Sequence, residues 1–287
     1  MAIFKRSIWE KEIRNALFSK AKVLKLMRND FFTGEEDRTA QGFKQSDTLA
    51  GAFYGGETVY FPKRGALNVN DYVQSSGVTI QTITTEDTAV NIDKHKEITF
   101  AITDIQKVQS NSDLRTGYTE DVGEKLKAAI ENEFFTAIND EAGIDTLNVT
   151  SADPKYQEVL AIQSELDNSF VPDSDRYIIA TPELDAYLRQ IKNGTIGASV
   201  YVDADPESVK TGVIGFLAGF QIIKSTNLPS GIQGIALHKN AAGLAYNWGV
   251  RVETWRDGQY KRDIVSADAR FGVGLLETDF IRKIVLV

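Results

Sequence analysis

The sequence predicts an α+β protein in which a long alternating strand precedes one long amphipathic helix. Between residues 90 and 102 the large apolar side chains fall on even positions, as expected of a strand with one buried face. After a polar break at residues 110–116, apolar residues recur every three or four positions, which indicates one stripe of a helix. Thr119 is the expected N-cap and Gly143 the expected end. Such a helix is roughly 30 Å long, so we expect a strut that carries other segments.

Composition bounds the class of protein. The chain has 287 residues, of which 42% are hydrophobic and 25% charged, which is typical of one large or two medium globular domains. Because there is no cysteine, a disulfide framework, a thiolate metal site and a cysteine nucleophile are all excluded. Residues 1–12 lack the apolar core of a secretory signal, and the most apolar run, residues 213–223, is too short to cross a bilayer. We therefore expect a protein that works in a cytosol or in a particle and does not contact a membrane.

The first 28 residues form a basic arm on an acidic body. They contain eight Lys or Arg against two Glu, a charge of about +6, which leaves about −14 for the rest of a chain whose net charge is −8. Apolar residues recur there at helical spacing, so we expect a basic amphipathic helix that lies on its own or on a neighbouring subunit, in preference to a membrane or nucleic acid. The residues predicted to make this contact between subunits are Trp9, Ile13, Leu17 and Leu24.

A second projecting segment is predicted between residues 58 and 84. A β-rich run at Thr58–Phe61 stops at Pro62, the chain then stays polar, and β character resumes at Val78–Thr84. Two strands with a long tip form a hairpin, which is marginal in water on its own. We expect something outside its own chain to cover it, and the alternative is a surface loop. The residues predicted to contact a neighbour are Tyr60, Lys63, Arg64 and Tyr72.

The second half of the sequence predicts short alternating helices and strands. Residues 156–166 have helical spacing, residues 177–180 read as a buried strand, and Thr181-Pro182 supplies an N-cap and a first-turn proline for a helix to residue 191. Further strands are expected at 220–224, 235–237, 250–255, 260–265 and 281–287, with a turn at Asp257-Gly258.

A search for chemistry finds no site. The two histidines, His95 and His238, have no ligand partner nearby in sequence, and no nucleophile elbow, zinc-helix or phosphate-loop motif is present. The sequence therefore predicts no catalytic residue, no cofactor and no metal. A chain of this size with an arm, a hairpin and a strut is built to touch copies of itself.

The order of these elements resembles the major capsid protein of tailed bacteriophages, the Hong Kong 97-type fold. Two runs carry the resemblance: Gly219 to Pro229 followed by Ala236 to Ala241, and Ile179 to Glu183. The resemblance implies an N-arm (1–50), an E-loop (51–86), a P-domain strand and spine helix (87–145), an A-domain (146–240) and a return to P-domain strands (241–287).

The resemblance also implies partners and a location. The subunit would form hexamers and pentamers in an icosahedral shell around double-stranded DNA, contacted non-specifically, in a virion assembled in the host bacterial cytoplasm. Separate scaffolding, portal and decoration proteins are expected. Some members cross-link an E-loop lysine, but no pattern here identifies an acceptor for Lys63. The alternatives are an encapsulin-type compartment, which would enclose proteins, and an unrecognised enzyme with a cleft between two α/β regions.

Overall fold

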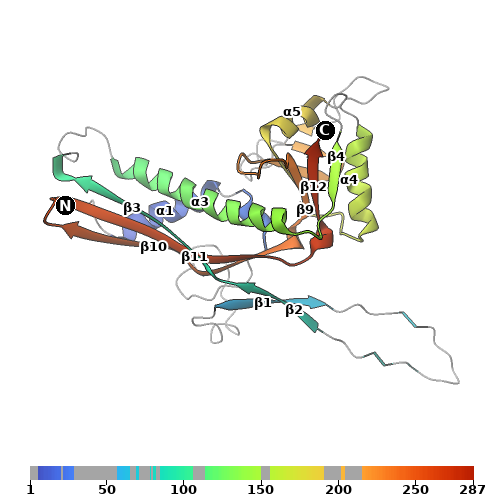
Figure 1. Cartoon of the computed structure of the whole chain (residues 1–287), viewed down its shortest axis with the longest axis horizontal. Helices are drawn as coiled ribbons and strands as arrows, with labels where there is room; N and C mark the ends of the chain where they lie inside the picture. Colours follow the sequence, from blue (N-terminus) through green and yellow to red (C-terminus); the bar gives the residue numbers. More distant parts are fainter. Residues whose placement is uncertain are drawn as a thin grey trace.

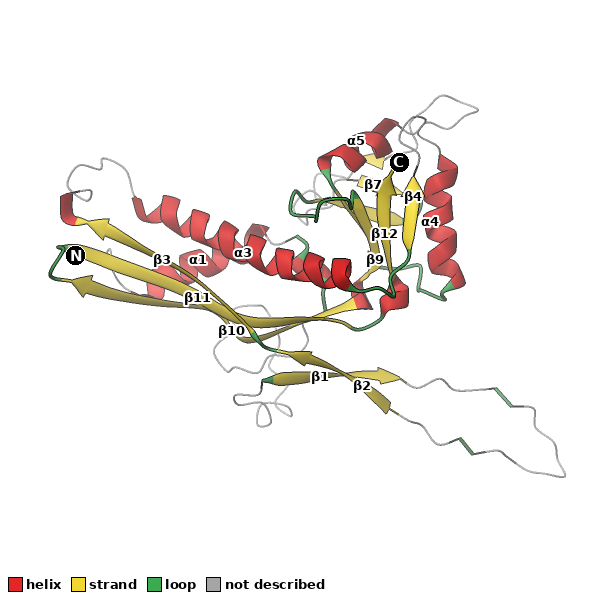
Figure 2. Cartoon of the chain, in the orientation of Figure 1, coloured by secondary structure: helices red, strands yellow, loops and turns green. Residues whose placement is uncertain are grey.

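The structure, a computed structural model, joins three parts. A long helix lies along a three-stranded sheet, a seven-stranded sheet with two helices stands at one end of it, and a two-stranded hairpin projects from the body (Figures 1 and 2). The α+β class predicted from the sequence is confirmed. The residues described are 6–20, 22–28, 57–64, 69–70, 78, 80–81, 85–105, 114–149, 156–190, 202–203 and 215–287.

The three-stranded sheet is antiparallel, in the order β10-β11-β3. Its strands are β3 (Lys94–Thr103), β10 (Ala242–Asp257) and β11 (Arg262–Leu275). The apolar side chains of one face are buried with the stripe of the long helix α3 (Leu114–Asp140) in the main core, which explains both sequence periodicities. β10 begins at Ala242, earlier than the strand expected from residue 250.

The N-terminal helix belongs to this core. α1 (Arg6–Lys20) packs on α3, and the 3₁₀ turn η1 (Leu24–Leu26) follows it. Trp9, Ile13, Leu17 and Leu24 are at most 3% exposed and pack among side chains of α3 and β10. The expectation that these four residues contact a neighbour is therefore corrected, because their apolar surface is already buried within the subunit.

A glycine lets α1 approach α3 closely. A Cβ added to Gly123 of α3 would lie 2.7 Å from Ala16 Cβ, 2.9 Å from the Leu17 nitrogen and 3.0 Å from the Ile13 oxygen. Two of these three atoms belong to the α1 backbone, which cannot move aside as a side chain can. The two helices can therefore adopt this distance only because position 123 has no side chain.

The seven-stranded sheet has the order β4-β12-β9-β5-β8-β7-β6. Helices α4 (Tyr156–Asn168) and α5 (Pro182–Gln190) contribute side chains to its core, and the Leu184 nitrogen donates to Thr181 Oγ1 at 3.3 Å, as expected of an N-cap. The predictions for these two helices and for β5, β8 and β9 are confirmed. The strands are β4 (Thr146–Val149), β5 (Arg176–Ala180), β6 (Val202–Asp203), β7 (Gly215–Leu217), β8 (Phe220–Lys224), β9 (Gly234–His238) and β12 (Ile281–Leu286).

Two further features differ from the predictions: the start of α3 and the sheet that β12 joins. α3 begins at Leu114, so Thr119 is a buried residue inside the helix and not its N-cap. The Tyr118 ring stacks on Phe100 of β3 with centroids 5.1 Å apart, so sheet packing stabilises a first turn that residue preferences alone did not indicate. β12 pairs with β4 and β9, so this segment joins the seven-stranded sheet and not the strands of β10 and β11.

The alternating stretch from residue 85 to residue 103 forms two strands in place of one. β2 (Thr85–Asn91) pairs with β1 (Thr58–Arg64), whereas β3 pairs with β11. The described residues at 78, 80 and 81 lie outside any strand, so the strand expected at 78–84 is wrong, and the expected loop boundary at residue 86 falls inside β2. β1 continues through Pro62, which pairs with Asp87 of β2. A proline has no N–H to donate, and it is tolerated here because each strand of a two-stranded sheet has one open edge.

Candidate assembly surfaces

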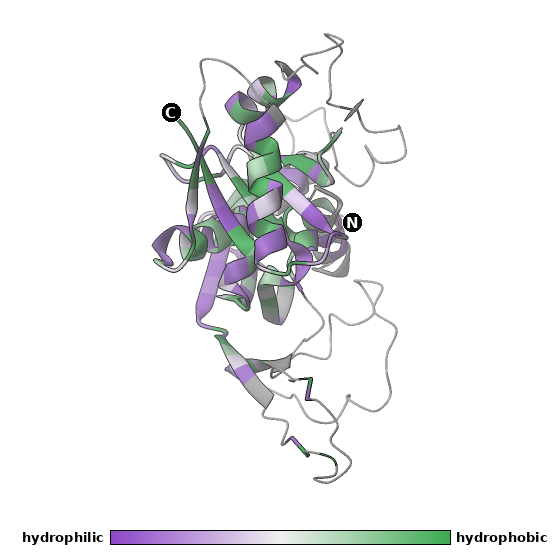
Figure 3. Ribbon diagram, turned by 90° about the vertical axis from the view of Figure 1, so that its right-hand side faces the viewer, coloured by the Kyte–Doolittle hydropathy of each residue, from purple (hydrophilic) through white to green (hydrophobic). Residues whose placement is uncertain are grey.

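The β1–β2 hairpin is anchored on the body by a small apolar cluster and then projects away from it (Figure 3). Val59 and Phe61 of β1, Val90 of β2 and Ile92 just after β2 are buried there against Ala245 of β10. Because an isolated hairpin is marginal in water, this cluster is what holds its base in place. We call these five residues the hairpin root.

Three glycines of β10 and β11 receive the hairpin root. A Cβ at Gly272 would collide with the carbonyl group of Asn91, and one at Gly274 would lie 2.5 Å from Val90 Cγ2. A Cβ at Gly243 would lie 2.8 Å from the Phe61 ring. Glycine inside a strand often marks such a close approach, so the sequence carried a signal that the sequence analysis did not use.

The hairpin also exposes apolar side chains, one within β1 and three beyond it. Tyr60 is 61% exposed, and Val69, Val78 and Ile80 are between 78% and 101% exposed. Apolar groups gathered on one projecting segment indicate a surface that another protein covers. The hairpin therefore has the features expected of an assembly surface.

Of the remaining hairpin residues predicted as contacts, the structure describes only the backbone of two. Lys63 and Arg64 lie at the end of β1, opposite Glu86 and Thr85 of β2. Their side chains, like Tyr72 as a whole, lie outside the described residues.

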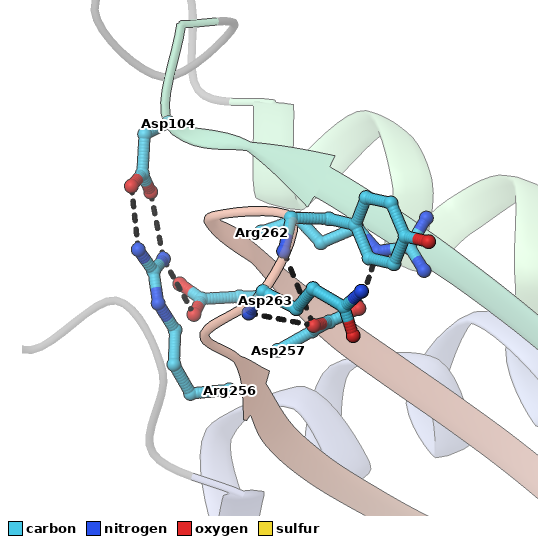
Figure 4. Close-up of polar contacts among 7 residues, drawn as sticks. Asp104, Arg256, Asp257, Arg262 and Asp263 are labelled. Carbon is cyan, nitrogen blue, oxygen red and sulfur yellow. Dashed lines mark hydrogen bonds and ion pairs between the residues drawn. The ribbon is translucent and has the colours of Figure 1, made fainter.

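The far end of the three-stranded sheet carries an ion-pair network (Figure 4). Arg256 of β10 donates from both terminal nitrogens to Asp104, at 2.7 and 2.5 Å, and to Asp263 of β11 at 3.1 Å. These hydrogen bonds raise the pKa of Arg256 above its ordinary value. The network ties the segment after β3 to both strands of the β10–β11 hairpin, beside the exposed Trp255.

The turn between β10 and β11 is organised by Asp257, as the sequence predicted for Asp257-Gly258 (Figure 4). Its carboxylate accepts from the backbone nitrogens of Gln259 and Tyr260 at 3.1 and 3.3 Å, and from Arg262 Nε at 2.9 Å. Desolvation raises the pKa of Asp257, but these hydrogen bonds outweigh it and lower the pKa overall. The sheet thus ends in an ordered polar tip.

A buried carboxylate joins the long helix to the seven-stranded sheet. Glu131 of α3 is 2% exposed, and its Oε2 accepts from Asn227 Nδ2, in the turn after β8, at 2.8 Å. Desolvation raises the pKa of Glu131, while Lys127 and the Asn227 hydrogen bond act in the opposite direction. This contact fixes how the two parts of the molecule meet.

The histidines have structural partners. His95 Nε2 lies 2.9 Å from Asp268 Oδ2, and Asp268 also pairs with Arg251 across the sheet. His238 Nδ1 accepts from the Asn240 nitrogen at 3.1 Å. Within the described residues, no group of three or more His, Cys, Asp or Glu side chains could hold a metal ion.

An open pocket of about 350 Å³ lies between β2, β3 and α3. Glu133 of the lining pairs with Lys94, also of the lining, at 3.8 Å and with Lys96 at 2.7 Å. The lining carries one lysine, Lys94, and three carboxylates, Asp93, Glu133 and Asp140, and Lys94 pairs with the first two of these. No helix in the described part of the chain has the length and apolar character needed to cross a membrane.

Comparison with known families decides the class. The profile of a family described as phage capsid protein matches residues 85–284, which spans both sheets and the long helix. The chain belongs to the phage capsid protein family. No curated protein sequence matches it.

Several solved structures have the same fold. The structure of Mycobacterium phage Che8 is 22% identical, with a TM-score of 0.59, over 80% of this chain and 84% of that one. The capsid of cyanophage P-SCSP1u is 17% identical, with a TM-score of 0.62, over 81% and 84%. A virus-like particle from Pyrococcus furiosus is 13% identical, with a TM-score of 0.60, over 98% of each chain. At these identities the likeness establishes the fold alone.

Family membership confirms the function predicted from the resemblance. The chain is a phage major capsid protein that forms the icosahedral shell, so it is a homo-oligomeric component of the virion capsid and a structural protein, not an enzyme. Of the two shell types that the sequence left open, the family match favours the phage shell over the encapsulin-type compartment.

Proposed function

We propose that the parts of this capsid subunit have the roles of the Hong Kong 97-type subdomains. The β1–β2 hairpin corresponds to the E-loop, α3 to the spine helix, the three-stranded sheet to the P-domain, and the seven-stranded sheet with α4 and α5 to the A-domain. The observation that carries the proposal is the projecting hairpin, which is anchored at its root and apolar beyond it.

In this proposal the subunits form hexamers and pentamers, and each hairpin reaches over a neighbour. The hairpin buries its apolar side chains there, which supplies the cover that an isolated hairpin lacks. α1, by contrast, acts within the subunit, because its apolar stripe is already buried against α3. Of the two places expected for the N-terminal helix, its own subunit or a neighbour, we therefore assign it to its own subunit.

We assign further partners on the same basis. A separate scaffolding protein would guide assembly, a portal protein would occupy one vertex, and a decoration protein could bind the outer surface. The shell would enclose double-stranded DNA and contact it only non-specifically, and the net charge of −8 gives the chain no overall positive field for tight phosphate binding. Assembly would take place in the host bacterial cytoplasm.

The test reverses the charge of the hairpin. Lys63 and Arg64 provide positive charge on a chain with a net charge of −8, so they suit an acidic surface of the neighbour. Each exposed pair contributes at most about 1 kcal/mol, but every subunit of a closed shell repeats it. We expect Lys63→Glu with Arg64→Glu to slow shell formation, followed by light scattering, and to leave the melting temperature of the subunit nearly unchanged.

A matched control makes the same change of charge elsewhere. Lys25 lies in η1 and Lys22 just before it, and both are exposed, so Lys22→Glu with Lys25→Glu alters the net charge equally at a site outside the hairpin. Assembly of the hairpin variant at the wild-type rate, at both low and moderate salt, would remove these charges from the mechanism. Equal slowing by both variants would show that net charge, and not the hairpin, is responsible.

A further inference from the structure

Phe170, in the loop between α4 and β5, is displayed at a steric cost. Its side chain is 93% exposed, and its φ of +55° lies in the left-handed region that favours glycine. It follows the last turn of α4, where the Val171 nitrogen donates to the Leu166 oxygen at 3.1 Å, in the manner of a helix C-cap. The C-cap accounts for the left-handed backbone, but no contact within the described part of the subunit accounts for the exposed ring.

Two buried arginines hold this loop rigid. Arg176, 2% exposed, donates to the carbonyl oxygens of Val171 and Pro172 at 2.6 and 2.8 Å. Arg282, 5% exposed, donates to Ser169 Oγ at 2.7 Å. The residues on both sides of Phe170 are therefore fixed, and a partner that contacts the ring does not have to order the loop first.

Carboxylates flank the exposed ring. Asp167 and Asp173 pair with Arg176 at 2.7 and 3.0 Å, yet the Asp173 side chain remains 91% exposed and that of Asp167 47% exposed. Arg176 and Arg282 are both buried whereas these carboxylates are exposed, so the charge presented at the surface around the ring is negative. It combines an apolar centre with a negative rim, which resembles the anatomy of a protein–protein contact.

We propose that Phe170 is an anchor between subunits, and that it binds the apolar part of the hairpin of a second copy, at Val78 and Ile80. This inference rests on the proposed role of the hairpin. Both hairpin side chains are at least 78% exposed, and the hairpin also carries Lys63 and Arg64, which complement the acidic rim. The apolar stripe of α1 is not available as the partner, because it is buried within its own subunit.

The first test uses disulfide trapping, for which a chain without cysteine is a clean background. Subunits carrying Phe170→Cys are mixed with subunits carrying Ile80→Cys or Val78→Cys, assembled and oxidised. Because a disulfide needs Cβ atoms about 3.5–4.5 Å apart, a covalent dimer on a non-reducing gel reports direct contact. The matched control is Phe216→Cys on β7, a 41% exposed phenylalanine away from the loop.

The second test is Phe170→Gly. Glycine adopts the left-handed conformation without steric cost, so the melting temperature of the subunit should not fall. Loss of an aromatic anchor should raise the concentration needed for assembly about tenfold or more. This opposite behaviour of folding and assembly is not expected of a residue that only stabilises the subunit.

The outcomes separate this inference from the proposed function. Dimers trapped at position 170 well above the position-216 control, together with the assembly defect of Phe170→Gly, support the inference. Particles that form normally with Phe170→Gly, or trapping at position 170 no greater than at position 216, overturn the inference alone. Failure of the Lys63/Arg64 reversal to affect assembly, with trapping at position 170 still present, overturns the charge mechanism and leaves the contact.

Discussion

The close approach of α1 to α3 leads to a prediction that can be worked out from two glycines of one helix. Gly123 faces α1 with no room for a methyl group, whereas an added Cβ at the exposed Gly117 meets nothing within 4 Å. Both positions lie in α3, so replacing either glycine by alanine improves helix propensity by about 0.5–1 kcal/mol. Only the Gly123 change adds overpacking, which costs about 1–3 kcal/mol.

The comparison of Gly123→Ala with Gly117→Ala therefore isolates the steric cost, because the propensity gain is common to both. We expect Gly117→Ala to stabilise the dissociated subunit slightly and Gly123→Ala to destabilise it. A difference of about 2 kcal/mol corresponds to roughly 4–8 °C in melting temperature. The assay is urea and thermal unfolding followed by circular dichroism. If both variants are stabilised equally, α1 does not pack on α3 as described.

Three further predictions concern other contacts. Trp9→Ala should destabilise the subunit by about 3–5 kcal/mol in urea unfolding, because Trp9 is fully buried, and an unchanged midpoint would return α1 to the role of an exchanged arm. Gly272→Val should release the hairpin root, seen as faster proteolysis of the hairpin with the C-terminal half still protected, whereas wild-type cleavage would contradict the close approach. Burial raises the pKa of Glu131, so its contribution to stability is fully present below the ordinary glutamate value and is lost as pH rises through the folded-state pKa. Glu131→Gln should remove that loss, and unfolding from pH 4 to pH 8 would show a flatter profile than wild type.

Local signals in the sequence were enough for helices α4 and α5 and for strands β5, β8 and β9. Thr181 and Pro182 begin α5 as predicted because an N-cap and a first-turn proline act through neighbouring backbone atoms. Partners distant in sequence were harder to predict. The stripe of α1 required burial, but an amphipathic pattern does not say whether the surface that covers it belongs to the same subunit or to a neighbour. In the structure the covering surface belongs to the same subunit, because α1 packs closely on α3 at Gly123. The role of this glycine depends on the helix beside it, so the sequence did not show it.

The same limit applies to the assembly surface. Sequence reasoning located the hairpin and its basic pair, yet placed its second strand too early, because a period of two continues unchanged through the bend at Ile92. The sequence did not single out Phe170, because a single aromatic residue after a helix usually belongs to the core. Only its exposure and its backbone conformation together make it notable.

The position of β12 has a consequence for the timing of synthesis. β12 lies between β4 and β9, and β4 has no other neighbour among the described strands. During translation β4 emerges long before β12, so its edge stays unpaired until residues 281–286 have left the ribosome. An incomplete polypeptide therefore cannot close the seven-stranded sheet from which Phe170 is displayed. We therefore expect chains that stop before residue 281 to enter a shell poorly, because this sheet is incomplete in them.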